Sequence, residues 1–166
     1  MLVKNNFNNV VIHSKAVADK NGRIGFGMDD SNGSISQNND ATHPILVEAV
    51  TLDAFLQDEP RIDLIKIDIK GAEGLALSGM KQILRLHRPV IFSEFSPNAL
   101  SKTSGISPED YLDELRGLGY ELYVVIQNND FTNQAPQSNQ EIMVKYAEYK
   151  SDHLDIQAVP RERSNL

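Results

Sequence analysis

The chain has 166 residues, of which 40% are hydrophobic, and this is enough for one compact domain with a sizeable core. Its 23 acidic residues outnumber its 16 Lys and Arg, and the net charge of -7 argues against binding to nucleic acid or to an anionic membrane. The chain has no cysteine, which excludes disulfides, thiolate metal sites and a cysteine nucleophile. The N-terminal residues include neither a long apolar run nor a small-residue cleavage site, so we expect a cytoplasmic protein without a membrane span.

The first third of the chain predicts three short strands and a brief helix. The strands are expected at residues 9–17, 23–28 and 45–50, where β-branched residues are frequent. A polar, turn-rich stretch at residues 29–44 predicts a mobile loop. Thr51 then provides a hydroxyl cap for a helix that extends to about residue 57.

The middle of the chain has the strongest pattern. Residues 62–69, IDLIKIDI, are nearly continuously apolar, which predicts a central parallel strand with helices on both faces of its sheet. Apolar residues at helical spacing predict a helix over residues 72–86. A second buried strand is expected at residues 90–92 and ends at Ser93 and Glu94.

The last third predicts a helix and a hairpin. A hydroxyl cap at Ser107, followed by proline and two acids, indicates a helix that ends at Gly119. Residues 120–126 are predicted to be a strand, paired antiparallel with another strand at residues 140–146 across a long connection.

The order of these elements defines the expected fold class. Alternating strands and helices followed by an antiparallel hairpin predict an α/β sheet with helices on both faces. We expect one domain over residues 1–150 and a poorly ordered, polar tail over residues 151–166.

Two carboxylates occupy the positions where ligands bind in open α/β sheets. Asp68 and Glu94 each lie where a buried strand ends, and ligands bind outside the carboxyl ends of such strands. Such a pair could take a proton, orient a hydroxyl or hold a divalent metal, or each residue could merely cap the following turn. Lys66 projects to the same face as Asp68, where it either pairs with that carboxylate or contacts a substrate.

Other polar residues have simpler interpretations. Glu73 opens the predicted helix at 72–86, where a carboxylate complements the helix dipole. The four histidines, at positions 13, 43, 87 and 153, are scattered without metal-ligand spacing, and we expect them to be non-catalytic.

The ordered set of these segments resembles the FkbM-type methyltransferases between about Asn5 and Tyr123. The matching segments are residues 9–11 (NVV), 16–19 (AVAD), Gly22, 51–53 (TLD), 62–68 (IDLIKID), 71–73 (GAE), Leu77, Gly79, 88–90 (RPV) and Glu94. An ordered series of this kind is more specific than any single motif.

The resemblance implies methyl transfer from S-adenosylmethionine to an oxygen of a small molecule or glycan acceptor. It also implies a Rossmann-like class I methyltransferase sheet, of which this chain would supply the C-terminal part. By position, Ala16 would lie near the adenine of the cofactor and Asp68 near its amino acid and reacting methyl group. Acids at these two strand ends bind magnesium in related methyltransferases, so a divalent metal at Asp68 and Glu94 is a further hypothesis.

The sequence departs from the family pattern in two ways. Lys70 stands where the family usually has an acid. The family's glycine-rich turn after its first strand, and the ribose-binding acid after its second, have no counterpart in this sequence. We therefore expect a truncated methyltransferase fold that binds little or no S-adenosylmethionine and is inactive when isolated.

The same gap predicts an exposed sheet edge beside residues 62–69, available for self-association or for a partner strand. Two interpretations stay open. The chain is either part of a methyltransferase or a non-catalytic relic or interaction module of the same fold.

Overall fold

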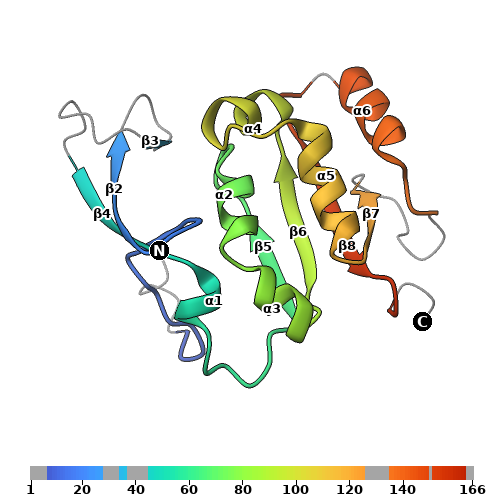
Figure 1. Ribbon diagram of the computed structural model, residues 1–166. Helices are drawn as coiled ribbons and strands as arrows, with labels where there is room; N and C mark the ends of the chain where they lie inside the picture. Colours follow the sequence, from blue (N-terminus) through green and yellow to red (C-terminus); the bar gives the residue numbers. More distant parts are fainter. Residues whose placement is uncertain (1–6, 28–33, 37–44, 126–134, 150, 164–166) are drawn as a thin grey trace.

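In the part of the chain that the structure describes, four strands come first, strands and helices are then interspersed, and the strands form two four-stranded sheets (Figure 1). The computed structural model describes residues 7–27, 34–36, 45–125, 135–149 and 151–163. The predicted mixed α/β class is confirmed.

The first sheet has the strand order β1-β4-β2-β3. The strands are β1 (Ala16–Val17), β2 (Gly22–Gly27), β3 (Ser34–Ser36) and β4 (Ile45–Val50). Strand β1 runs parallel to β4, whereas β2 runs antiparallel to both β4 and β3. The prediction at 45–50 is confirmed, but the predicted strand over residues 9–17 is reduced to β1, because residues 9–14 are exposed. Part of the predicted loop at 29–44 is strand β3, and the remainder lies outside the described residues.

The second sheet has the order β5-β6-β8-β7. Its strands are β5 (Leu64–Ile67), β6 (Val90–Phe95), β7 (Tyr120–Val124) and β8 (Leu154–Pro160). Strand β5 is parallel to β6, and β8 is antiparallel to both β6 and β7. The prediction that residues 62–69 form a central strand is wrong, since no strand of the described part pairs with the outer edge of β5.

The C-terminal elements also differ from the prediction. Residues 140–146 are not a strand but part of helix α6 (Asn139–Glu148), whose N-cap Ser138 and Glu141 form a capping box. The partner of β7 is instead β8, which lies in the segment expected to be a poorly ordered tail. Leu154, Ile156 and Ala158 alternate with more exposed residues, and burial of this apolar row against the helices explains why the segment is a strand.

The helices cover one face of the second sheet only (Figure 1). They are α2 (Glu73–Ser78), α3 (Lys81–Leu86), α4 (Pro97–Thr103), α5 (Pro108–Gly117) and α6. Side chains on the covered face, such as Ile91 and Phe95, are fully buried, whereas Leu64 on the other face is 57% exposed. The prediction of helices on both faces is therefore wrong for the described residues. We call the uncovered side the open face.

The predicted helix over residues 72–86 is interrupted between α2 and α3 by Gly79. A Cβ at Gly79 would lie 2.1 Å from the carbonyl oxygen of Ala18, so glycine permits the first sheet to approach closely here.

Asp53 belongs to the short helix α1 (Leu52–Phe55), and its carboxylate accepts hydrogen bonds from the N–H groups of Gln82 and Ile83 at 3.1 and 2.9 Å. Asp53 thus caps α3 and joins the two sheets.

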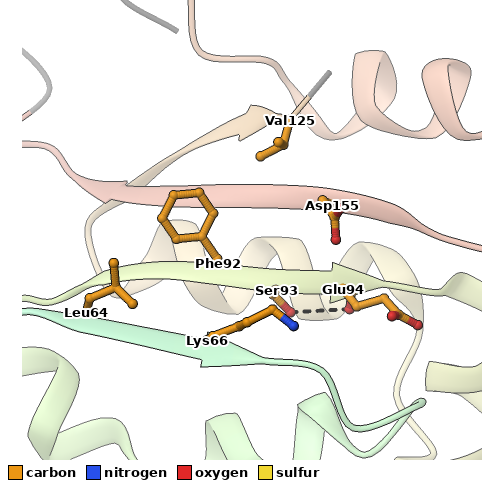
Figure 2. A pocket seen from close by; sticks show the side chains of 7 residues that line it. All are labelled: Leu64, Lys66, Phe92, Ser93, Glu94, Val125 and Asp155. Atoms are coloured by element: carbon orange, nitrogen blue, oxygen red, sulfur yellow. Dashed lines mark hydrogen bonds between the residues drawn. The ribbon is translucent and has the colours of Figure 1, made fainter. Parts of the chain in front are cut away.

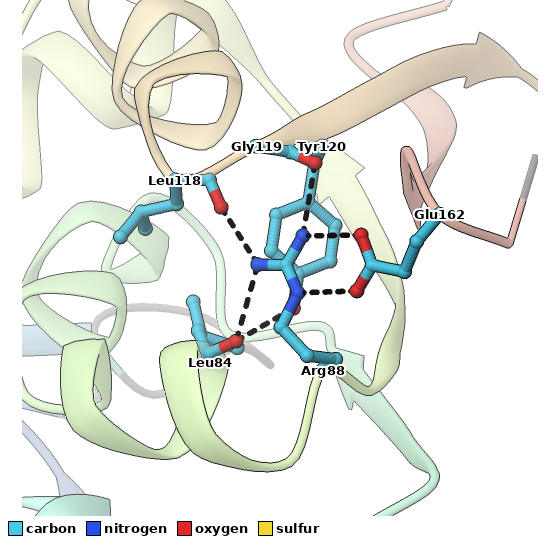
Figure 3. Close-up of polar contacts among 6 residues, drawn as sticks. All are labelled: Leu84, Arg88, Leu118, Gly119, Tyr120 and Glu162. Atoms are coloured by element: carbon cyan, nitrogen blue, oxygen red, sulfur yellow. Dashed lines mark hydrogen bonds and ion pairs between the residues drawn. The ribbon is translucent and has the colours of Figure 1, made fainter.

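Arg88 connects three separate segments at the amino end of β6 (Figure 3). Its guanidinium donates to the carbonyls of Leu118 and Gly119 at 2.7 and 3.0 Å, and it forms a bidentate pair with Glu162 at 2.7 and 3.1 Å. The guanidinium carbon also lies 4.7 Å from the centre of the Tyr120 ring. Arg88 therefore links the segment that follows β8 to the residues that precede β7.

The helices are short. The longest ones, α5 and α6, have 10 residues each, and in the described part of the chain no helix could span a bilayer.

Candidate functional site

The carboxyl ends of β5 and β6 bring Asp68 and Glu94 together. The two strands are parallel and in register, with Ile67 opposite Ser93, so the residues that follow these two lie side by side. The two carboxyl groups interact, and each shifts the pKa of the other. The predicted convergence of Asp68 and Glu94 is confirmed.

The turn after Asp68 is fixed by close packing around Gly71. Gly71 has φ 89°, and a Cβ there would lie 2.4 Å from the carbonyl oxygen of Ala99. The hydroxyl of Ser104 donates to the Gly71 carbonyl. Only glycine fits this backbone conformation and this approach without displacing its neighbours.

Glu73 holds the same turn from inside the protein. Its side chain is fully buried, and one carboxylate oxygen accepts the N–H of Ile69 at 3.2 Å. Burial raises the pKa of Glu73, an effect that its bonds to backbone N–H groups oppose. Glu73 thus fixes the turn that carries Asp68, in addition to its predicted place at the start of α2.

Lys66 pairs with Asp68 on the open face. Its Nζ lies 2.5 Å from Asp68 Oδ2, and the two side chains are 66% and 47% exposed. This hydrogen bond raises the pKa of Lys66 and lowers the pKa of Asp68. The predicted shared face is confirmed, but the lysine is not buried, because no helix among the described residues covers it. An ammonium that keeps its proton is unsuited to act as a base.

Glu94 differs from Asp68 in its preferred protonation state. Burial raises the pKa of Glu94, and the hydrogen bond with Asp68 raises it further. The pKa of Asp68 is lowered, first by its bond to Lys66 and then by its bond to Glu94. Asp68 is therefore the more acidic of the two carboxyl groups, and Glu94 is the one that binds a proton more readily.

A shallow pocket of about 250 Å³ lies on the open face beside this pair (Figure 2). Its lining residues are Leu64, Lys66, Phe92, Ser93, Glu94, Val125 and Asp155. Three of these are apolar side chains from three different segments, and the charged groups lie toward the carboxyl ends of the strands. An apolar floor with a few polar groups at one end suits a small organic ligand.

Strand β8 brings Asp155 to the pocket, and His153 immediately before the strand lies near it; the sequence analysis placed neither residue in the site. Asp155 lies directly opposite Glu94 in the antiparallel pairing. His153 precedes β8, and its Nδ1 lies 2.8 Å from Asp152 Oδ1. The sequence signal for both residues was the alternating apolar pattern of the segment LDIQAVP, which indicates a strand.

Ala16 lies elsewhere. It is a half-buried residue of β1 in the first sheet, where it pairs with Ala49, and it does not line the pocket. Its predicted place near an adenine stays a prediction.

The site does not fit a divalent metal. In the described part of the chain no cluster of three or more His, Asp or Glu side chains has a suitable arrangement. The ammonium of Lys66 also donates a hydrogen bond to Asp68 Oδ2, and this oxygen would have to be free to coordinate a metal. The carboxylates do fit a ligand's ammonium or hydroxyl group, since Asp68 is half exposed and anionic.

Open α/β sheets bind ligands at the carboxyl ends of their strands, and in this chain that end carries the carboxyl pair beside the pocket. A family model described as the methyltransferase FkbM domain matches residues 2–122, and the chain belongs to this family. The suspected resemblance is therefore confirmed, and the domain is of a methyltransferase type. No curated protein and no solved structure gives a significant match to the chain.

Proposed function

We propose that this chain acts as part of an S-adenosylmethionine-dependent methyltransferase that modifies an oxygen of a small molecule or glycan acceptor, in the cytoplasm. The observation that supports this proposal most is the carboxyl pair Asp68 and Glu94 at the ends of β5 and β6 in a chain of the FkbM family. When bound, the cofactor supplies the methyl group.

The site residues have different tasks in this proposal. Asp68, ionised and half exposed, would bind the ammonium group of the cofactor or a hydroxyl of the acceptor. Glu94 would exchange a proton with the acceptor, because its raised pKa makes it a better proton acceptor once it is ionised. Lys66 would keep Asp68 ionised and in place.

The test is transfer of a deuterium-labelled methyl group to a panel of sugars and small hydroxyl compounds, followed by mass spectrometry. The chain should be assayed as given and together with any residues that its gene encodes before Met1. Replacing Asp68 by Asn should lower transfer at least ~100-fold, as expected when a charged contact to the reacting groups is removed.

A matched control is available immediately before the same strand. Asp63 lies at the opposite end of β5 with a 57% exposed side chain, so Asp63→Asn should leave transfer unchanged. Equal transfer by wild type and Asp68→Asn would refute the assigned role of Asp68.

The uncovered parts of the second sheet favour the alternative, an interaction module of the same fold. The outer edge of β5 has no partner strand in the described part of the chain, and Leu64 beside it is 57% exposed. A free edge with exposed apolar residues can pair with a second copy or with a strand from another protein. Concentration-dependent self-association together with no methyl transfer would favour this alternative.

A further inference from the structure

Glu73 is fully buried, and only one of its two carboxyl oxygens is hydrogen-bonded. Oε1 accepts the N–H of Ile69 at 3.2 Å, whereas Oε2 has no hydrogen-bond partner in the part of the chain that the structure describes. A buried carboxylate with an unpartnered oxygen is unfavourable, because its charge leaves water without full compensation. The neutral carboxyl group has much less of this penalty, so the folded structure favours the protonated form of Glu73 more than water does.

The groups around Glu73 act in the same direction. Burial is the largest effect on the pKa of Glu73 and raises it, bonds to backbone N–H groups lower it, and the charge of Asp68 after β5 raises it again. Burial also raises the pKa of Glu94 on β6 and of Tyr111 on α5, and an ionised Glu73 adds to both shifts. Ionisation of Glu73 therefore brings a further negative charge to the carboxyl ends of β5 and β6.

The turn that Glu73 holds, residues 68–71, is open to water and carries backbone strain. Asp68, Ile69 and Lys70 are exposed, whereas Gly71 is buried and bonded through its carbonyl to the hydroxyl of Ser104. Lys70 has φ 48°, in the left-handed region where a residue with a side chain is strained. Displacement of the exposed residues 68–70 would relieve this strain and admit water to Glu73, which are the features of a segment that opens locally.

We propose that Glu73 is a pH-sensitive switch for the turn that carries Asp68. With its proton bound, Glu73 stays buried and bonded to Ile69, and the closed turn keeps Asp68 beside Glu94. When the proton passes to water, the carboxylate becomes hydrated, the turn opens, and Asp68 is no longer held beside Glu94. This inference goes beyond the proposed function and does not depend on it, because it concerns the conformation of the turn and not the transfer of a group.

The first arm of the test follows the amide of Ile69 by NMR in the nitrogen-15-labelled chain from about pH 4 to pH 8. Because this N–H donates to Glu73, its shift should change with a midpoint above the ordinary glutamate pKa of about 4.3. The change should disappear in Glu73→Gln, which keeps an acceptor oxygen but stays neutral. It should remain in Glu94→Gln and in Glu109→Gln, which alters an exposed glutamate in the first turn of α5. A change that survives Glu73→Gln, or a wild-type midpoint at or below the ordinary value, would overturn the proposal.

The second arm measures opening by amide hydrogen exchange, corrected for the intrinsic effect of pH on exchange. The probes are the amides of Ile69 and Ala72, whose N–H groups bond to Glu73 and to the carbonyl of Ile69. Each opening of the turn releases one proton between the ordinary glutamate pKa and the Ile69 midpoint. Protection should therefore fall about 10-fold per pH unit over this range and level off above it. In Glu73→Gln this pH dependence should be lost.

Two results of the second arm would overturn the switch. One is constant protection of the turn across the Ile69 midpoint, since Glu73 would then titrate without moving the turn. The other is protection of the turn equal to that of Ile91 in β6 at every pH, since exchange would then need unfolding of the whole sheet. The wild-type midpoint and slope test the proposal without any variant.

Failure of the switch and failure of the proposed function are distinguishable. Neither arm contains a cofactor or an acceptor, so the absence of methyl transfer leaves the switch standing. An active methyltransferase whose turn is equally protected at every pH keeps the proposed function and loses the switch.

Discussion

Replacing Arg88 by Ala should destabilise the second sheet without affecting the carboxyl pair. The guanidinium contacts the carbonyls of Leu118 and Gly119, the ring of Tyr120 and the carboxylate of Glu162, and its side chain is only 22% exposed. Arg88 has φ 51°, and alanine would be under the same backbone strain, so this strain cancels in the comparison.

The magnitude follows from the separate contacts. Two carbonyl oxygens lose a charged donor, at about 1 kcal/mol each. The contact with the Tyr120 ring contributes about 0.5 kcal/mol. The pair with Glu162 contributes about 0.5 kcal/mol only, because that carboxylate is 54% exposed and screened by water. The free energy of unfolding should therefore fall by about 3 kcal/mol, which corresponds to a drop in Tm of roughly 9 °C.

Urea unfolding and calorimetry on three variants test this reasoning. Arg88→Lys keeps the charge but loses the planar fork, so it should recover about half of the loss. Glu162→Gln removes only the exposed ion pair and should cost less than about 1 kcal/mol. A loss from Glu162→Gln as large as that from Arg88→Ala would refute the claim that the carbonyl contacts dominate.

Three further predictions concern the site and its surroundings. Gly71→Ala should destabilise by at least about 2 kcal/mol more than Gly105→Ala in urea unfolding, because both have positive φ but only Gly71 packs against Ala99; equal effects would contradict this. The free energy of unfolding of Glu94→Gln, relative to that of the wild type, should rise from pH 4 to pH 7. The raised pKa of Glu94 means that its protonated form stabilises the wild type, and this contribution is lost as pH rises through that pKa. The amide of Gln stays neutral over the same range. A stability difference that is the same at both pH values would exclude this. Leu64→Lys should reduce any self-association that sedimentation experiments detect. A wild type that stays monomeric at all concentrations would argue against self-association through the unpaired edge of β5.

Elements with strong local signals were predictable from the sequence. Strand β4 has the predicted bounds, and the hydroxyl caps of Thr51 and Ser107 start α1 and α5 as expected. Helix α6 was missed because its apolar residues were interpreted as a strand, although Ser138 and Glu141 have the spacing of a capping box. Helix α4 (Pro97–Thr103) was also not predicted.

The place of each strand in its sheet was less predictable. The apolar run at residues 62–69 indicates a strand but does not tell whether both faces and both edges are covered. In the structure β5 is an edge strand with an open face, which explains why Lys66 is exposed.

The candidate site was predictable only in part. Asp68 and Glu94 follow apolar strands, so their convergence could be inferred from strand direction alone. Asp155 and His153 reach the same place only because β8 inserts between β6 and β7, which is a tertiary pairing over long sequence separation. Apart from the alternation of apolar and polar residues, the sequence of residues 153–160 contains no motif that indicates a site.

The most direct test of the central claim is an NMR titration of the nitrogen-15-labelled chain with S-adenosylmethionine at millimolar concentration, where weak binding is still visible. We predict that amide shifts change at residues 68–71 and at Glu94, and that these changes are lost in Asp68→Asn but kept in Asp63→Asn. Unchanged amides at the ends of β5 and β6, or equal changes in wild type and Asp68→Asn, would contradict the assignment of this end of the sheet as the ligand site.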